Sequence, residues 1–422
     1  MNEIIAVLRK YNFWDSNTID LGYLRTGYTE KIADYTGNRL IKVLVGQRRA
    51  GKSFILRQIV KHLIAKGISP NNTLIINKEF SDFDFLSSYK NLDDLIKLYK
   101  SHLKPSGKIY IFIDEIQDIS GWERVVNSYS QDYVDNYELF ISGSNSKMLS
   151  NELATLLSGR YVRFEIFPFS YNEYLGITDG KKSKQTYIGY LESGGMPELF
   201  MLFKQETKRN YVAAIKDTVL LRDIIQRHNI RESRLLEDIF AYLINNASNL
   251  ISVSNIFKYY KGSGRKTSYD IIANYICYIE DAFLIHRCER FNIKGKEIIA
   301  GNVKFYANDL SFKNYLYPGF GYGFGYLVEN LIYLELRRAG YEVYTGSIKD
   351  KEVDFVASKG DKVIYIQCAY LLTEPATIVR EYMPLETISD NYEKYIVTLD
   401  DITLPSNKGI RHIQAWNFGE QL

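Results

Sequence analysis

The stretch VLVGQRRAGKSF, residues 43–54, constrains the fold of this chain more than any other segment. It contains the pattern G-x-x-x-x-G-K-[ST]. An apolar run, residues 40–45, precedes the pattern, and apolar residues at helical spacing follow it. Strand, glycine loop and helix in that order surround a phosphate with backbone N–H groups and with the positive end of the helix. The sequence therefore predicts a nucleotide site. A chance match is the alternative, and the flanking strand and helix count against it.

The residues of this loop have different expected roles. Lys52 would reach the β- and γ-phosphates of the nucleotide, and the Ser53 hydroxyl would hold Mg²⁺. Gly46 and Gly51 would let the backbone curl around the anion. The remaining expected nucleotide contacts are Gln47, Arg48, Arg49, Ala50 and Phe54.

A second apolar run, KIYIFIDEIQDI at residues 108–119, ends its strand in two carboxylates, Asp114 and Glu115. So apolar a run suits a strand that is buried on both faces of a parallel sheet. Open α/β sheets bind ligands at the carboxyl ends of their strands. We therefore expect Asp114 to reach Mg²⁺ and Glu115 to polarise the attacking water. An ordinary acidic turn is the alternative.

Two further polar positions are candidates for catalysis. The apolar residues 138–142 predict a strand that ends at Gly143, after which Asn145, or failing that Ser144, could orient the water. Arg160 follows a short helix and could act across a subunit interface on the γ-phosphate of a neighbour, as an arginine finger does. A simple polar turn and an ordinary surface arginine are the respective alternatives.

Residues 168–248 predict an all-helical lid. Ser170 is the expected N-cap of its first helix, and Glu173 would complete a capping box.

Residues 249–300 have the layout of a winged helix-turn-helix. Helices at 252–259 and 268–280 flank a glycine-bearing turn, and an apolar strand at 282–287 follows. The second helix would offer basic side chains to DNA; a packing or oligomerisation module is the alternative. The expected DNA contacts are Lys261, Arg265 and Lys266.

Residues 301–422 predict a further α/β domain. A helix carboxylate, Glu329, a strand carboxylate, Asp354, and Gln367 on the next strand resemble the layout of a restriction-endonuclease-type site. Gln367 stands where a second strand carboxylate is expected, and Ala369 stands where the lysine is expected. We therefore expect a degenerate nuclease-like site in a domain that binds rather than cleaves. The expected elements are a helix at 327–339 and strands at 342–345, 352–357 and 362–369.

The composition limits the cellular setting. A net charge of +3 over 422 residues is too weak to demand a nucleic-acid or membrane partner. The chain has no apolar stretch long enough to span a bilayer, and its first residues do not resemble a signal peptide. Three scattered cysteines fit a reducing compartment. We therefore expect a cytoplasmic protein with no membrane partner.

Together these motifs resemble a known family. The segments that carry the resemblance are GQRRAGKS, FIDEIQDISGWE, ISGSNS, LSGR, FPFSYNEYL, GGMPE, RDIIQRH, IEDAFLI, YLVENLIYLEL, EVDF and YIQCAY. The chain is similar to bacterial and archaeal AAA-type ATPases, of the AAA+ or STAND-related kind, whose C-terminal domain of unknown function has a restriction-endonuclease-like fold. The resemblance implies ATP rather than GTP, and nucleotide-site roles for Lys52, Ser53, Asp114 and Glu115.

The predicted fold is α/β, in four parts. These are an AAA-type P-loop core with a parallel sheet (1–167), a helical lid (168–248), a winged-helix-like part (249–300) and a restriction-endonuclease-like, non-cleaving domain (301–422). The predicted function is Mg²⁺-dependent ATP hydrolysis that rearranges the winged-helix and C-terminal parts, with a homo-oligomer as one expected assembly. Two alternatives stay open: a slow-turnover nucleotide switch that binds DNA or a protein partner, and, with less support, an ATP-gated DNA nuclease.

Overall fold

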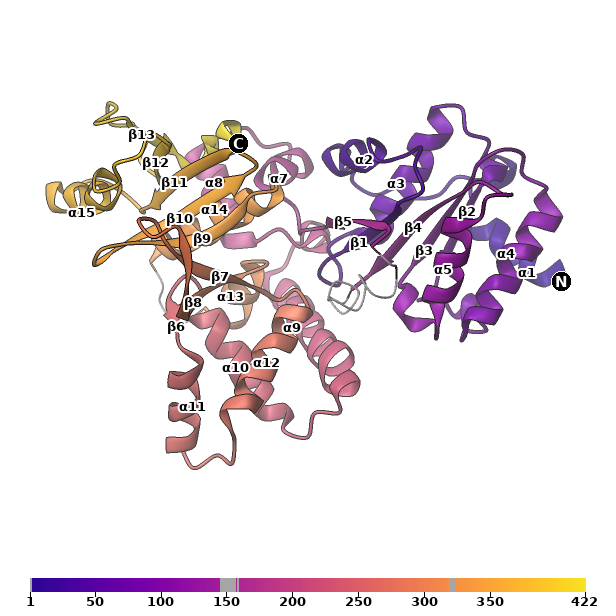
Figure 1. Ribbon diagram of the computed structural model, residues 1–422, viewed down its shortest axis with the longest axis horizontal. Coiled ribbons are helices and arrows are strands. Elements are labelled where there is room, and N and C mark those ends of the chain that lie inside the picture. Colours follow the sequence, from indigo (N-terminus) through magenta and orange to yellow (C-terminus); the bar gives the residue numbers. More distant parts are fainter. Residues whose placement is uncertain (1, 145–156, 158, 319–322) are drawn as a thin grey trace. The chain divides into compact units, whose positions relative to one another are not determined.

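The computed structural model describes residues 2–144, 157, 159–318 and 323–422 (Figure 1). The chain divides into two compact units, Met1–Ile166 and Phe167–Leu422, here called the N-terminal and the C-terminal unit. No helix among the described residues is both long enough and apolar enough to cross a membrane.

The N-terminal unit is built on a five-stranded sheet in which every neighbouring pair is parallel. Its order, β2-β3-β4-β1-β5, confirms the predicted parallel-sheet core. In this order β4 lies between β1, which precedes the glycine loop, and β3, which ends at Asp114. The strands are β1 (Ile41–Val45), β2 (Thr73–Asn77), β3 (Ile109–Asp114), β4 (Tyr137–Gly143) and β5 (Tyr161–Glu165). The helices are α1 (Asn2–Tyr11), α2 (Thr26–Ala33), α3 (Lys52–Ala65), α4 (Tyr89–Leu103) and α5 (Trp122–Gln131).

The helix after the glycine loop, α3, packs on this sheet as its sequence spacing predicts. Leu56, Ile59 and Leu63 recur at helical intervals, are buried, and belong to one core cluster with residues of the strands. In that cluster Phe112 of β3 and Phe140 of β4 stack with ring centroids 4.5 Å apart. Because apolar burial is the main favourable term in folding, this packing fixes the loop between β1 and α3.

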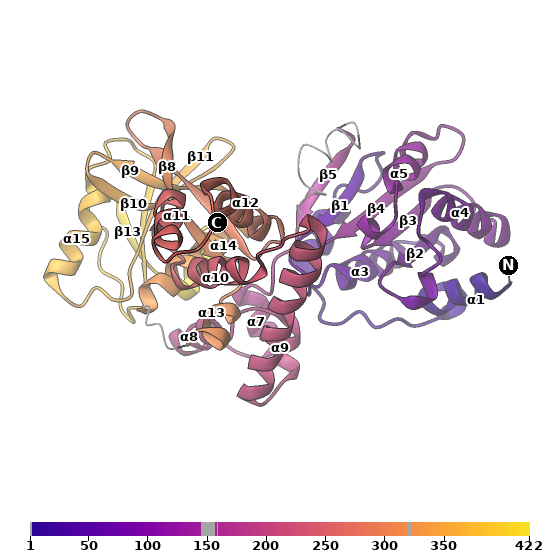
Figure 2. The same ribbon diagram turned by 90° about the horizontal axis from the view of Figure 1, so that it is seen from below.

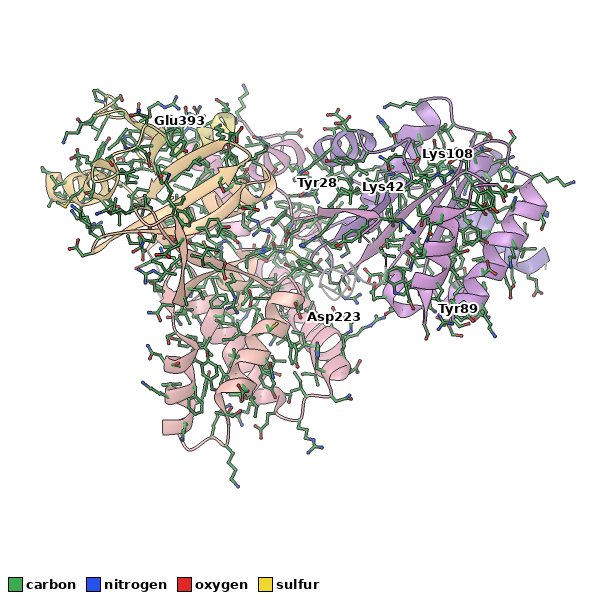
Figure 3. All side chains as sticks on the ribbon, viewed as in Figure 1. Tyr28, Lys42, Tyr89, Lys108, Asp223 and Glu393 are labelled. Atoms are coloured by element: carbon green, nitrogen blue, oxygen red, sulfur yellow. The ribbon has the colours of Figure 1, made fainter. Side chains whose placement is uncertain are left out.

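A buried ion-pair cluster ties β1 to β4. The Glu138 carboxylate accepts hydrogen bonds from Lys42 and, at 2.9 Å, from Lys108. Figure 3 labels these two lysines in the N-terminal unit. The carboxylate also accepts the Gly37 backbone N–H at 3.0 and 3.1 Å. A fully buried carboxylate needs such partners, because an unpaired buried charge is costly.

The C-terminal unit begins with helices, in agreement with the prediction for residues 168–248. The predicted capping box is present, since Glu173 N donates to Ser170 Oγ at 3.3 Å and Ser170 N donates to Glu173 Oε2 at 2.8 Å. A π-helical segment, Val219–Gln226, continues the helix α9. The α-helices are α7 (Tyr171–Ile177), α8 (Lys184–Ser193), α9 (Gln205–Thr218) and α10 (Ser233–Asn245).

One eight-stranded sheet, in the order β13-β12-β11-β10-β9-β7-β8-β6, runs through the rest of this unit. It joins strands from the predicted winged-helix part to strands from the predicted C-terminal domain, through parallel pairing of β7 with β9. The strands are β6 (Leu250–Ile251), β7 (Ile285–Asn292), β8 (Glu297–Ala307), β9 (Glu342–Ile348), β10 (Lys351–Lys359), β11 (Lys362–Cys368), β12 (Glu393–Thr398) and β13 (Ile410–Gln414). The helices are α11 (Val253–Gly262), α12 (Tyr269–Asp281), α13 (Ser311–Leu316), α14 (Phe324–Arg338) and α15 (Pro375–Glu386).

Two helices cover opposite faces of this sheet, and a third group of helices adjoins it. Phe355 and Ile366 pack in the cluster of α14, whereas their neighbours Val356 and Tyr365 pack in the cluster of α15. Successive side chains of a strand point to opposite faces, so α14 and α15 lie on different sides. Figure 2 shows α10, α11 and α12 grouped together.

One expected strand starts in the wrong place. Residues 282–284, predicted as the start of a strand at 282–287, form the turn after α12, and β7 begins at Ile285. Phe283 takes a left-handed conformation there, with φ of 56°. The apolar residues of this turn are buried, so their hydrophobicity resembled that of a strand.

Candidate functional site

The glycine loop follows β1 at the carboxyl end of the parallel sheet. Gly46 has φ of 143°, and a Cβ atom there would lie 2.2 Å from Ile166 O, so only glycine fits. Gly51 has φ of 95° and is the N-cap of α3, which begins at Lys52. The loop thus turns from strand to helix as predicted, and the first N–H groups of α3 face the loop.

Lys52 is buried over this loop. Its Nζ donates to Gly46 O and to Gln47 O, both at 3.0 Å, and lies 3.9 Å from Glu115 Oε1. Burial lowers the pKa of Lys52, although Glu115 and Asp114 oppose this effect. The ammonium therefore lies between the loop and the carboxylates at the end of β3.

Asp114 ends β3 and is 2% exposed. It accepts hydrogen bonds from the hydroxyls of Ser142 and Ser53 and, at 3.0 Å, from Asn77 Nδ2. Burial and the neighbouring Glu115 raise the pKa of Asp114. The structure thus brings together Ser53 and Asp114, the two residues predicted to hold Mg²⁺.

Glu115 follows Asp114 and is 5% exposed, with φ of 52°. Burial opposes its ionisation, but Lys52, Arg48 and two hydrogen-bond donors outweigh burial and lower its pKa. The donors are Gln117 Nε2 at 2.5 Å and Ser144 Oγ at 3.0 Å, both to Glu115 Oε2. A carboxylate that stays ionised in a buried site can accept a proton from water.

The remaining catalytic candidates are Ser144, Asn145 and Arg160, and only Ser144 has a described side-chain contact with Glu115. Ser144, the second choice for orienting water, contacts Glu115, whereas Asn145, the first choice, lies outside the described residues. Arg160 is exposed, and its carbonyl accepts the Ile41 N–H at 2.9 Å; its action on a neighbouring subunit stays a prediction. Sequence reasoning missed Ser142, whose signal was a single hydroxyl near the end of the apolar strand β4.

Side chains around the loop extend the site. Arg48 pairs with Glu79, which follows β2. The Phe54 ring lies over Gly22, and the guanidinium of Arg57 lies 4.2 Å from the centroid of this ring. The expected contact of Phe54 with nucleotide stays a prediction.

Arg25, which no motif indicated, is buried and donates from Nη1 to Ala50 O at 2.8 Å. It therefore helps to hold the loop in place.

The three basic residues proposed for DNA contact differ in their surroundings. Lys261 and Lys266 are exposed. Arg265 is half-buried, pairs with Asp238 of α10, and lies over the ring of Tyr260. The charge of Arg265 is therefore partly neutralised by Asp238 within the protein.

The nuclease-like residues of the C-terminal unit come together around an unexpected lysine. Lys304 of β8 is 4% exposed, and its Nζ lies 2.8 Å from Glu329 Oε1, 2.8 Å from Glu352 Oε1 and 3.5 Å from Asp354 Oδ1. Gln367 lies beside them, where its Oε1 accepts the Asp354 N–H at 3.3 Å. The sequence did not predict β8, so it did not place this lysine.

The charges of this Lys304 cluster depend on each other. Burial raises the pKa of Glu329 and the pKa of Asp354, although Lys304 opposes both shifts. Burial also opposes the charge of Lys304, but the three carboxylates outweigh it and raise the lysine pKa. Within the described part of the chain, no three His, Cys, Asp or Glu side chains are grouped so that they could hold a metal ion.

Comparisons with known proteins identify the kind of protein. Residues 38–175 match the family model described as an AAA domain, and residues 184–321 match a domain of unknown function. An uncharacterized protein of Haemophilus influenzae is 32% identical over 380 residues, which cover 89% of this chain and 92% of that protein. An uncharacterized protein of Methanocaldococcus jannaschii is 31% identical over 356 residues, which cover 79% of this chain and 75% of that protein.

Among solved structures, the Walker-type ATPase of Pyrococcus abyssi is 16% identical, with 70% of this chain and 95% of that chain covered. The TM-score of this comparison is 0.48. The AAA domain match agrees with the loop, the carboxylates and the parallel sheet described above. The chain therefore belongs to an AAA-type ATPase family, together with these relatives from Haemophilus influenzae and Methanocaldococcus jannaschii.

Proposed function

We propose that the chain hydrolyses ATP to ADP and phosphate with the help of Mg²⁺. The observation that carries this proposal is the position of Lys52, whose Nζ lies between the loop carbonyls and Glu115 Oε1. Ser53 and Asp114 suit Mg²⁺, because they offer a hydroxyl and a carboxylate oxygen that already share a hydrogen bond. When bound, Mg²⁺ would neutralise charge on the β- and γ-phosphate oxygens.

The side chains would divide the work of hydrolysis. Lys52 would neutralise the phosphates from the loop side, and Glu115, which stays ionised, would accept a proton from the attacking water. Ser144 and Gln117 would orient the Glu115 carboxylate through their hydrogen bonds. Bond cleavage between the γ-phosphorus and the bridging oxygen would then release ADP and phosphate. Such catalysis rests on positioning and charge neutralisation.

A slow-turnover switch is the second candidate, and one observation favours it. Glu115 Oε2 already accepts two hydrogen bonds, and Glu115 Oε1 faces Lys52. A carboxylate held in this way is a weaker base for water until these bonds rearrange. The protein would then hold nucleotide and signal its presence to a DNA or protein partner.

The rest of the chain would carry the response to nucleotide. The order α10-β6-α11-α12-β7-β8 supports a winged-helix-like part, and the order α14-β9-β10-β11-α15-β12 supports a restriction-endonuclease-like domain. Residues 168–248 would form a helical lid. The Lys304 cluster supports a C-terminal domain that does not cleave, because an ammonium stands among the carboxylates that a metal would need.

The first experiment is steady-state ATP hydrolysis by the purified chain, with and without Mg²⁺ and duplex DNA, over a range of protein concentrations. Turnover that needs Mg²⁺ and is lost in Glu115→Gln supports the hydrolase. Bound nucleotide with negligible turnover supports the switch. Failure to bind any nucleotide would contradict both. Turnover that rises with protein concentration would support an assembly in which Arg160 acts in trans.

A further inference from the structure

Arg48 is the third residue of the glycine loop and has a partner from another strand. Its Nη1 contacts Glu79 Oε1 just beyond the end of β2. The Arg48 side chain is 11% exposed and that of Glu79 is 36% exposed. The Glu79 N–H donates to Asn77 Oδ1 at 2.8 Å, and Asn77 Nδ2 donates to Asp114 Oδ2 at 3.0 Å. The partner of Arg48 thus belongs to a row of polar groups that ends on Asp114.

The positive charge of Arg48 affects the pKa values of two residues at the proposed phosphate site, Glu115 and Lys52. It is one of the charges that lower the pKa of Glu115, and it also helps to lower the pKa of Lys52. Glu79 acts on Lys52 in the opposite sense. The Arg48 guanidinium thus acts electrostatically on both Lys52 and Glu115, whose Nζ and Oε1 atoms lie 3.9 Å apart at the proposed phosphate site.

We propose that Arg48 is a ligand of the terminal phosphate of a nucleoside triphosphate, and that Glu79 competes with this phosphate for the guanidinium. This inference rests on the proposed nucleotide binding and adds to it a means of distinguishing triphosphate from diphosphate. A guanidinium binds a carboxylate and a phosphate in the same forked geometry, so one can replace the other. Glu79 is partly exposed and can be rehydrated when Arg48 leaves it. A diphosphate offers no group at that position, so Arg48 would stay with Glu79.

The test compares affinities for ADP and for a non-hydrolysable ATP analogue, measured by calorimetry in the full chain with Mg²⁺. Arg48→Ala should weaken the ATP analogue about tenfold or more, the size expected for a charged hydrogen bond, and leave ADP nearly unchanged. Glu79→Gln should tighten the ATP analogue and leave ADP unchanged. In the double variant the effect of Glu79→Gln should vanish, because its target is gone. Asp93→Asn, which removes the exposed pair with Lys97, should change neither affinity.

The outcomes separate this inference from the function on which it rests. A wild-type chain that binds both nucleotides, with an affinity ratio unmoved by Arg48→Ala, would overturn the role of Arg48 and leave nucleotide binding intact. Equal losses for both nucleotides in Arg48→Ala would also overturn it, because they would indicate a role in loop structure. A wild-type chain that binds neither nucleotide would overturn the proposed function and this inference together. Thermal melting of each variant checks that the chain is folded.

Discussion

Lys304 Nζ lies 2.8 Å from Glu329 Oε1, although the two residues come from β8 and α14. The same Nζ also contacts Glu352 and Asp354 of β10. A lysine of the chain itself therefore balances the negative charge of these buried carboxylates. The C-terminal unit owes this arrangement to β8, the strand that the sequence did not reveal.

Lys304→Met should destabilise the chain strongly. Removing one partner of a buried ion pair typically costs about 3–5 kcal/mol of unfolding free energy, because the remaining charges lose their compensation. Lys408→Met, which removes an exposed pair with Glu386, should cost less than about 1 kcal/mol. Urea unfolding of both variants, followed by circular dichroism, measures the difference. Equal costs for the two variants would contradict the central role of Lys304.

The deficit of Lys304→Met should shrink in mild acid. Burial holds the pKa values of Glu329 and Asp354 above their unfolded values, so the folded state binds protons more tightly than the unfolded state. Lys304 opposes both shifts, so the two pKa values should rise further in the variant. Lowering the pH from about 7 to about 5, which stays above the unfolded pKa values near 4, should therefore favour folding of the variant more than folding of wild type. Unfolding curves at both pH values test this sign. A deficit that grows in acid would contradict it.

Lys52→Ala should abolish ATP binding. The expected loss of affinity is about 100-fold or more, which corresponds to about 3 kcal/mol. Lys61→Ala, an exposed position on the same helix, is the matched control and should bind as wild type does. Calorimetric titration with ATP compares the two. Unchanged affinity in Lys52→Ala would rule out the assigned role of the loop.

Glu115→Gln should retain ATP and lose turnover. The amide keeps the shape of the side chain but cannot accept a proton, and general-base catalysis contributes about 100- to 10,000-fold to a rate. Glu123→Gln on α5 is the control and should keep full turnover. A phosphate-release assay measures kcat for both. If turnover survives in Glu115→Gln, the base lies elsewhere.

Replacing Lys261 and Lys266 with Ala should weaken DNA binding without changing stability, if the winged-helix-like part binds DNA. Each lost phosphate contact should reduce the salt slope by about 0.9. Arg265→Ala should instead lower the melting temperature, because Arg265 pairs with Asp238 and covers Tyr260. Fluorescence anisotropy at several salt concentrations and thermal melting separate the two effects. No change in affinity or slope for the lysine variants would assign this part to packing.

Much of the nucleotide site could be predicted because its signals are local. The glycine loop and the carboxylate pair each occupy one continuous segment, and a buried parallel strand has a recognisable apolar run. The contact between Ser142 and Asp114 was not predicted, because Ser142 lies inside the apolar strand β4, whereas the predicted polar contacts, Ser144 and Asn145, follow the end of that strand.

The ion pairs of Lys304 with Glu329, Glu352 and Asp354 could not be predicted from the sequence, for a different reason. In residues 297–307, Gly301 and Asn302 divide the apolar residues into two short groups, so no continuous apolar run marks a buried strand. A lysine in such a segment is expected to be exposed, since lysines are almost never fully buried unless they are paired. The partners that bury it come from α14 and β10, which follow later in the chain.

The pairing of β7 with β9 also limits how this chain can exchange parts during evolution. Arg290, Phe291 and Asn292 lie in register with Thr345, Gly346 and Ser347. Recombination that joined residues up to 300 to a foreign tail would separate these strands and leave β7 with an open edge. An open strand edge is a template for pairing with other chains, which leads to aggregation. Recombination that leaves this sheet intact must therefore transfer β7 and β9 together.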